Sequence, residues 1–182
     1  MEGSMGLERS KKQETKNLFE IADTVVFGTR GIYRVDNIET MEIGKNRQKF
    51  YSLVQVYSKT IHRNLVSESS KDMLEIRPII TADEYFKLGT QFDRIHIDPL
   101  EFGLNSNKKI QAYTAWIHEE GFMGLVKVYL ATCMDISKNP KIDKRLKQFN
   151  KKVRGSIIEE VATALTTSLV EAEETLKKVF LD

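Results

Sequence analysis

The sequence predicts an α+β protein in which a small antiparallel β-barrel is followed by a compact all-α domain. Between Thr24 and about Ile80, short runs rich in Val, Ile, Tyr and Phe alternate with turn residues, which is typical of antiparallel hairpins. From Thr81 onward the apolar residues recur every three or four positions, which is the period of an amphipathic helix. The 182 residues, 41% of them hydrophobic, suffice for one domain or two small ones.

The expected strands are the runs TVVFG, GIYRVDNI, KFYSLVQVY and TIHRNLV. Gly28 and Gly31 bracket the first turn, where we expect a positive backbone φ. Four or five short strands leave exposed edges unless the sheet curls, so we expect a barrel of the SH3 or Tudor kind. The chain then divides into a disordered tail or expression remnant (1–18), a sheet domain (19–80) and a helical domain (81–182).

The helical half carries recognisable start and stop signals. Thr81 and Glu84 have the spacing of a capping box. Gly121 is a stop between two helical segments, the second of which is apolar almost all round and therefore buried. Asp143 is an expected N-cap for the last segment, which is either one long amphipathic helix or two stacked end to end, with Gly155 as the bend.

Charge is balanced overall and segregated locally. The chain has 28 Lys and Arg against 26 Asp and Glu, so its bulk charge does not indicate nucleic-acid binding. A basic block precedes an acidic one near the C-terminus. Such a block is either a phosphate-facing surface or an ordinary solvated helix face. The basic block comprises Lys138, Lys141, Lys144, Arg145, Lys147, Lys151, Lys152 and Arg154, and the acidic one Glu159, Glu160, Glu171, Glu173 and Glu174.

No residue pattern indicates catalysis. His62, His96 and His118 fall in different elements without metal-ligand spacing, and we expect Cys133 to be a small core residue. We therefore predict no enzyme activity, no metal site, no cofactor and no small-molecule substrate. With a single cysteine, no apolar run of about 20 residues and no apolar leader, we expect a soluble cytoplasmic protein that does not enter a membrane.

The order of the motifs resembles that of the CarD-like bacterial transcription regulators, the CarD and CdnL group. The segment FEIADTVVFGTRGIYRVDNIETMEIGKNRQKFYSLVQV resembles the start of that family, LVSESSKDMLEIRPIIT resembles its "GLRPIIS" region, and NSNKKIQAYTAWI parallels its "NWxRRYxxNLxKL". The similarity runs in consistent order from Phe19 to Leu165. The best-matched positions are Phe19, Asp23, Val25, Val26, Phe27, Gly31, Ile38, Glu39, Gly44, Tyr51, Arg77, Pro78, Ile79 and Ile80.

This resemblance implies a transcription regulator with two partners. In the family, the Tudor-like domain binds the β subunit of RNA polymerase, and the helical domain contacts promoter DNA and stabilises the open complex. The implied polymerase-binding residues are Arg30, Arg34, Met41 and Arg63. The implied DNA-binding residues are Ser106, Lys108 and Lys109, through weak, mainly phosphate contacts.

The chain departs from the family at positions that matter for both partners. Met41 replaces an arginine, Ser67 replaces a proline, and Ser106 replaces the tryptophan that wedges into the minor groove. Trp116 lies about three helical turns from Ser106 and has the spacing of a packing residue. These departures keep an alternative open: a protein-interaction module of the same fold that has lost promoter binding.

Overall fold

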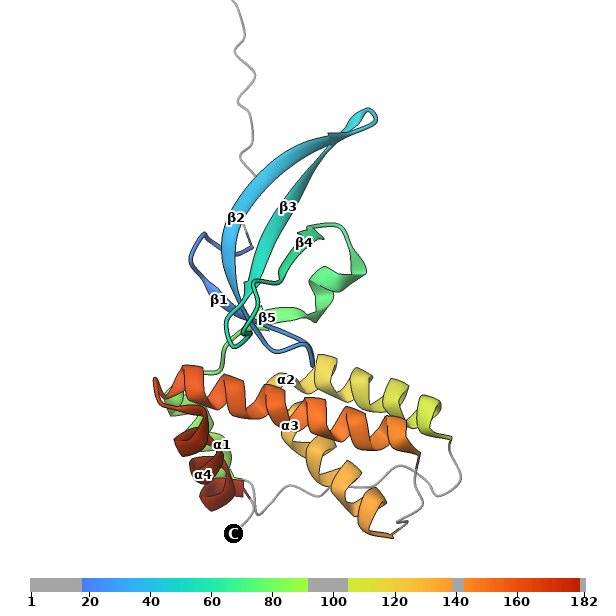
Figure 1. Cartoon of the computed structure of the whole chain (residues 1–182), viewed down its shortest axis with the longest axis vertical. Coiled ribbons are helices and arrows are strands. Elements are labelled where there is room, and N and C mark those ends of the chain that lie inside the picture. Colours follow the sequence, from blue (N-terminus) through green and yellow to red (C-terminus); the bar gives the residue numbers. More distant parts are fainter. Residues whose placement is uncertain (1–17, 92–104, 139–142, 181–182) are drawn as a thin grey trace, which may run out of the picture.

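The computed structural model describes residues 18–91, 105–138 and 143–180 and shows a β-sheet standing on a layer of helices (Figure 1). The predicted α+β class is confirmed. Residues 1–17 of the expected tail, His96 and Lys141 lie outside the described residues. None of the helices in the described ranges combines the length and the apolar character that a membrane span requires. The strands are β1 (Thr24–Phe27), β2 (Ile32–Ile43), β3 (Asn46–Gln55), β4 (Arg63–Ser67) and β5 (Ile76–Pro78); the helices are the 3-10 helix η1 (Lys71–Glu75), α1 (Ala82–Gln91), α2 (Ser106–Lys138), α3 (Lys144–Ala164) and α4 (Leu169–Phe180).

The sheet is antiparallel, as predicted, but it is open. Its strand order is β4-β3-β2-β1-β5, so β4 and β5 form the two edges. The expected closure into a barrel is wrong, because no pairing joins β4 to β5 among the described strands. Instead, η1 lies between them in sequence and contacts both. It buries Met73 against the sheet and so covers the end of the core that strand pairing would otherwise close.

The β2–β3 hairpin is longer than the sequence pattern predicts. Pairing continues to Ile43 opposite Asn46, so the turn is only two residues long. Gly44, at a φ of 63°, allows this tight reversal, because a side chain disfavours that backbone region. A register shift between Val35 and Asn37 marks a bulge. Beyond Phe50, where the pairing of β3 with β4 ends, β2 and β3 extend away from the helices as a two-stranded arm (Figure 1).

One face of the sheet carries the core of the β-domain. Tyr51 and Leu53 are fully buried on β3, and Phe19 packs edge-on against Tyr51 with ring centroids 6.2 Å apart. These side chains alternate with outward-facing ones, which is the expected period of two. The buried set is Val25, Phe27, Tyr33, Val35, Tyr51, Leu53, Val66, Met73 and Ile76.

Two helix starts form as predicted. The backbone amide of Thr81 donates to Glu84 Oε2 at 2.9 Å, and the amide of Glu84 donates to Thr81 Oγ1 at 3.2 Å, which completes the capping box of α1. The bond from the Thr81 amide, and a second one from the Thr81 hydroxyl to the same carboxylate oxygen at 2.7 Å, hold the pKa of the Glu84 carboxyl below its usual range. Asp143 caps α3 by accepting from the amide of Arg145 at 2.9 Å.

The break between α3 and α4 comes later than the sequence pattern predicts. Helix α3 passes through Gly155 without interruption and ends at Ala164, where Thr166 takes a φ of 51°. A second capping box then starts α4: the amide of Ser168 donates to Glu171 Oε2 at 3.1 Å. Hydrogen bonds from Thr167 and Ser168 lower the pKa of Glu171 to about 2.

Helix α2 contains the predicted interruption at Gly121. Its backbone there is non-helical, with φ 59° and ψ −124°, so the helix axis changes direction (Figure 1). The first half places Tyr113 and Ile117 in the helical core, and the second half adds Phe122, Leu125 and Val128. The kink therefore lets two helical segments of different direction contribute to one core.

Replacing Gly121 with alanine is expected to lower the free energy of unfolding by about 1–3 kcal/mol, because residues with a Cβ are strained at a φ of 59° and a ψ of −124°. Gly155→Ala is the matched control. Gly155 lies in a regular helix with open space where a Cβ would stand, so alanine there is expected to add about 0.5–1 kcal/mol. Urea unfolding of both variants measures the difference, and equal effects would contradict the role of the kink.

Candidate functional site

The outer face of the sheet, opposite the core, is partly exposed and brings two of the predicted polymerase-binding arginines together. Arg34 on β2 lies opposite Val54 on β3, and Val54 lies opposite Arg63 on β4. Directly paired residues point to the same face, so the two arginines flank Val54 at roughly 10 Å from each other. Leu65, two residues along β4, is 51% exposed on this face. Arg63 forms an ion pair with Asp36, with 3.1 Å between Nη2 and Oδ2.

The other two predicted polymerase-binding residues lie elsewhere. Arg30 is in the β1–β2 turn, where its guanidinium contacts Asp72 at 3.1 Å and lies 4.1 Å from the centre of the Phe27 ring. Met41 is half-buried near the end of the β2–β3 arm, roughly 20 Å along the strand from Arg34. The structure therefore groups Arg34 with Arg63 and separates Arg30 and Met41 from them.

The paired lysines at the start of α2 have different environments. Lys108 is exposed. Lys109 is buried, where its Nζ donates to Asp135 Oδ1 at 2.7 Å, and Tyr113 donates to the other oxygen of Asp135 at 3.0 Å. A phosphate could reach the Lys109 ammonium only by displacing this buried carboxylate. The predicted phosphate contact therefore stays a prediction for Lys108, and Lys109 has a structural role.

Ser106 and Trp116, the two residues considered for a minor-groove wedge, have different environments. Ser106 is the first residue of α2 and is half-buried. Trp116 packs against the helical core, edge-on to Tyr113 with ring centroids 5.5 Å apart. The predicted packing role of Trp116 is confirmed, and it does not replace the missing wedge.

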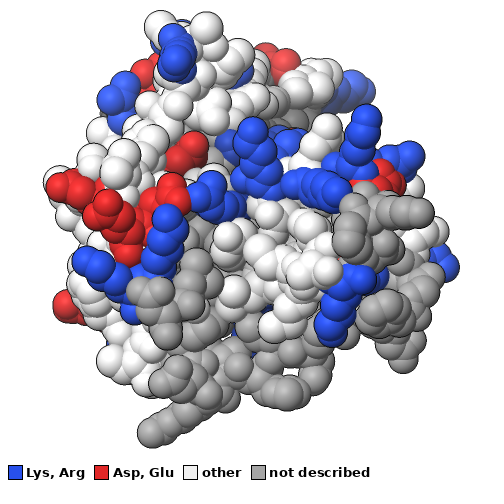
Figure 2. Space-filling view, turned by 60° about the horizontal axis from the view of Figure 1, so that its bottom comes forward, with Lys and Arg blue, Asp and Glu red and all other residues white. Residues whose placement is uncertain are grey.

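The first half of α3 presents a basic face. Between residues 144 and 154 the sequence contains six Lys and Arg and no Asp or Glu. The buried stripe of α3 includes Leu146, Phe149 and Val153, so the lysines between them face outward. Figure 2 shows a band of Lys and Arg side chains across this side of the molecule, with a larger group of Asp and Glu side chains toward its left end and a smaller one at its right end. We call the exposed set of Lys144, Arg145, Lys147, Lys151 and Lys152 the α3 basic face.

The start of α2 adjoins the α3 basic face. Arg145 Nη1 donates to Asn107 Oδ1 at 2.9 Å, which places the first turns of the two helices side by side. Lys108 follows Asn107 directly and adds its charge to the same region. The N-terminal ends of helices carry partial positive charge, so the two helix starts add to the potential of the lysines.

A buried ion pair joins the sheet to the helices. Arg77 on β5 donates to both oxygens of Glu160 on α3, at 2.6 and 2.7 Å, and the Glu160 side chain is fully buried. The amide of Ile80 also donates to Glu160 at 3.1 Å. The Arg77 side chain lies 3.6 Å from the position of a Cβ on Gly121, so it sits in the bend of α2. One arginine thus contacts α3 and the kink of α2 together.

Sequence reasoning missed this junction, although one signal was present. Glu160 follows Ile157 by three residues, so it falls on the apolar stripe of α3 rather than on its charged face. A carboxylate on such a stripe needs a buried partner, because an unpaired charge there is strongly unfavourable. The partner, Arg77, is 83 residues away in sequence, and no local pattern connects the two.

A second carboxylate at the junction gives a pH-dependent prediction. Glu159 Oε2 accepts from the amide of Ile32 at 3.2 Å. Burial raises the pKa of Glu159, and the hydrogen bond from Ile32 opposes this only in part. The folded protein therefore holds this proton at a higher pH than the unfolded chain does, so stability is lost as pH rises from about 4.5 through the folded pKa.

The variant Glu159→Gln keeps an oxygen acceptor and never ionises. The stability of the variant relative to wild type is expected to increase as pH rises from about 4 to about 7. In that window the wild-type Glu159 loses its proton more readily in the unfolded chain than in the folded protein, and the glutamine has no proton to lose. Denaturant unfolding of both proteins at each pH measures the difference. A difference that stays constant or falls with pH would contradict the raised pKa.

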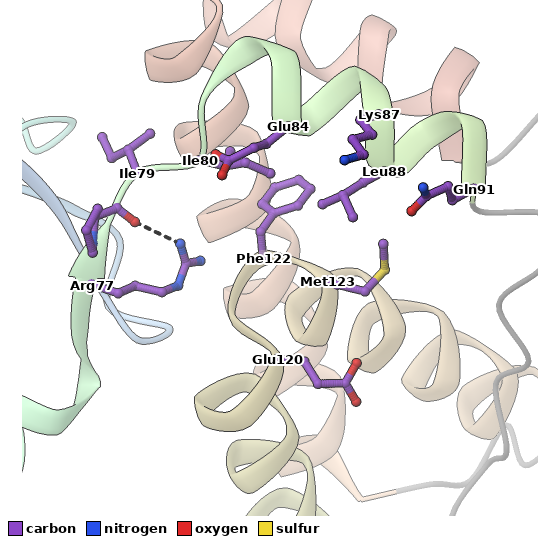
Figure 3. A pocket seen from close by; sticks show the side chains of 11 residues that line it. Arg77, Ile79, Ile80, Glu84, Lys87, Leu88, Gln91, Glu120, Phe122 and Met123 are labelled. Atoms are coloured by element: carbon purple, nitrogen blue, oxygen red, sulfur yellow. Dashed lines mark hydrogen bonds between the residues drawn. The ribbon is translucent and has the colours of Figure 1, made fainter.

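An open pocket of about 510 Å³ lies between α1 and the kink of α2 (Figure 3). Phe122, Leu88 and Met123 form its apolar side. Three of its charged groups already have partners: Arg77 binds Glu160, Glu84 belongs to the capping box, and Glu120 accepts from Lys127 at 2.5 Å. Lys87 is the remaining charged group on the rim.

Among the described residues, no group of three or more His, Cys, Asp or Glu is placed to hold a metal ion. His62 and His118 belong to different parts of the fold, the approach to β4 and the first half of α2. Cys133 is half-buried on α2 and accepts from Asn150 at 3.4 Å. No protein-family model matches this chain, and no curated protein is significantly similar to it.

Proposed function

We propose that the protein is a CarD-like transcription regulator that binds RNA polymerase through its sheet domain and promoter DNA through its helical domain. The observation that carries the proposal is the α3 basic face, five exposed Lys and Arg in a stretch, 144–154, that contains no Asp or Glu. A cluster of positive charge on one helix face is the expected footprint of a phosphate-binding surface. The exposed outer face of the sheet supplies the second, separate surface.

The α3 basic face suits phosphate contacts without base readout. Lys144 and Lys151 are seven residues apart and so lie about 10 Å apart along one side of the helix. Lysine acts as a mobile point charge, which suits phosphates and carries little sequence information. Arg145 is held by Asp143 at 3.7 Å and by Asn107, so it contributes charge rather than a free bidentate fork. We therefore propose salt-sensitive, sequence-independent contact with DNA near the melted region.

The outer face of the sheet suits a protein partner. Val54 and the exposed Leu65 form an apolar centre, and Arg34 and Arg63 flank it. An apolar centre surrounded by charge is the usual arrangement at a protein interface. Strand β4 pairs only with β3 among the described strands, so its free edge can also add a strand from a partner. The β subunit of RNA polymerase is the proposed partner, in keeping with the family resemblance.

A second function is favoured by the residues at the start of α2. Ser106 offers no aromatic wedge, and Lys109 is buried against Asp135. A module that binds the polymerase or another protein without contacting DNA would keep the sheet surface and lose these contacts. The two functions differ in one property, which is the affinity of the helical domain for DNA.

The test is binding of the full-length protein to the β subunit of its cognate RNA polymerase by biolayer interferometry. We expect a micromolar or tighter Kd, weakened at least tenfold by Arg63→Glu, which reverses a charge beside the apolar centre. Arg47→Glu is the matched control, because Arg47 is equally exposed but lies near the tip of the β2–β3 arm, paired with Glu42 at 3.2 Å. Absent binding, or equal effects of the two reversals, would contradict polymerase docking by this face.

A further inference from the structure

A cleft of about 290 Å³ separates the sheet domain from the first half of α2. One wall consists of the β1–β2 turn and η1, with Thr29, Lys71 and Leu74. The other wall is one side of α2, with Ala115, Ile117 and His118. The cleft is distinct from the outer face of the sheet and from the α3 basic face, and all of its lining residues are described.

The cleft has an apolar interior that the protein leaves open. Leu74 lines it and is 68% exposed, although its neighbour Met73 is buried in the sheet core. The junction between sheet and helices is held from α3, through Glu160 and Glu159, so this side of α2 is not drawn against η1. A ligand that filled the cleft would cover Leu74 and Ala115, and removing apolar surface from water favours binding.

One basic group that lines the cleft has no ion pair among the described residues. Arg77 binds the buried Glu160, and Glu75 lies 3.8 Å from Arg30, which also contacts Asp72 at 3.1 Å. Lys71 has no ion pair within the described part of the chain, and the His118 imidazole has no hydrogen bond there. An anionic group at the rim would therefore meet one free ammonium and one imidazole.

The size of the cleft limits the ligand. A cavity of about 150 Å³ in another protein accommodates benzene. The volume of this cleft, about 290 Å³, therefore suits a single aromatic ring or two fused rings. We propose that the cleft binds a small aromatic carboxylate, with the ring between Leu74 and Ala115 and the carboxylate at Lys71. The ligand spans the sheet domain and α2, and it is bound rather than chemically changed. Binding of such a ligand does not depend on the proposed function.

The test is titration of 2-naphthoate into the full-length protein. Binding is measured by isothermal titration calorimetry and by changes in the amide chemical shifts. A ligand of this size in an apolar cleft is expected to bind with a Kd on the order of 0.1–1 mM. Ala115→Leu fills the cleft and is expected to weaken binding at least tenfold. Gln111→Leu, one turn earlier on the same helix and outside the cleft lining, is expected to leave the Kd unchanged.

The charge requirement is tested separately with Lys71→Gln. This change is expected to weaken 2-naphthoate several-fold and to leave 2-naphthamide, a neutral molecule of the same shape, unaffected. Lys71 and Ala115 are both exposed, so Lys71→Gln and Ala115→Leu leave the buried core intact. The proposal is overturned if Ala115→Leu does not weaken binding, or if the wild type binds the amide as tightly as the acid. The second result would identify a purely apolar slot, such as one for a partner side chain.

Discussion

Arg77→Ala is expected to lower the free energy of unfolding by about 3–5 kcal/mol, the usual effect of removing one partner from a buried ion pair. The change leaves the Glu160 carboxylate fully buried with the amide of Ile80 as its remaining donor. An unpaired buried charge is far more costly than the lost contact itself. Urea unfolding of the full-length protein measures the effect.

Arg47→Ala is the matched control for that measurement. Arg47 also pairs with a glutamate, Glu42, but both side chains are about two-thirds exposed, and such surface pairs contribute less than about 1 kcal/mol. The double variant Arg77→Met with Glu160→Leu is expected to recover much of the loss, because it removes both charges and fills the space with apolar groups. A cost for Arg77→Ala no larger than that for Arg47→Ala would contradict the role of the junction.

Replacing Lys144, Lys151 and Lys152 together with glutamine is expected to weaken DNA binding about 10²- to 10³-fold at about 0.1 M salt. Each phosphate contact releases about 0.9 counterion on binding. The loss of all three contacts should therefore decrease the magnitude of the slope of log K against log salt by about three. Fluorescence anisotropy with a labelled duplex at several salt concentrations measures both quantities. Lysine and glutamine are both good helix formers, so α3 is expected to remain folded.

The control for the triple variant changes the net charge by the same amount at other sites. Lys45, Lys59 and Lys87 are exposed and lie on the β2–β3 arm, the β3–β4 connection and α1. Their replacement by glutamine is expected to leave the slope unchanged. If the two triple variants behave alike, the contact is with overall charge rather than with α3, and the protein-interaction module becomes the better description.

Local signals predicted the helical half well. The capping box at Thr81 and Glu84, the N-cap at Asp143 and the break at Gly121 all form as expected, because each depends on residues a few positions apart. Gly155 does not bend α3. A glycine in a helix interior lowers stability but does not by itself interrupt the hydrogen bonds, and the packing of Val153 and Ile157 keeps the helix regular.

The features that the sequence did not predict depend on distant contacts. Strand β5 has three residues, too few to show a period, and it exists because it pairs with β1. The open sheet results from η1, which occupies the end of the core where strand pairing was expected. Lys109 looked like half of an exposed basic pair, and only the fold brings Asp135 to it from 26 residues away.

The separation of charge along the helical layer has a consequence for how the protein would meet a polyanion. The α3 basic face lies near one end, whereas Glu171, Glu173 and Glu174 belong to α4 at the other end, where Lys177 and Lys178 offset part of their charge (Figure 1). A body with separated charges experiences a torque in the field of a nucleic acid, which turns its positive end forward before contact. The torque acts within the screening length of about 8–10 Å, so orientation and association rate would fall together as salt increases.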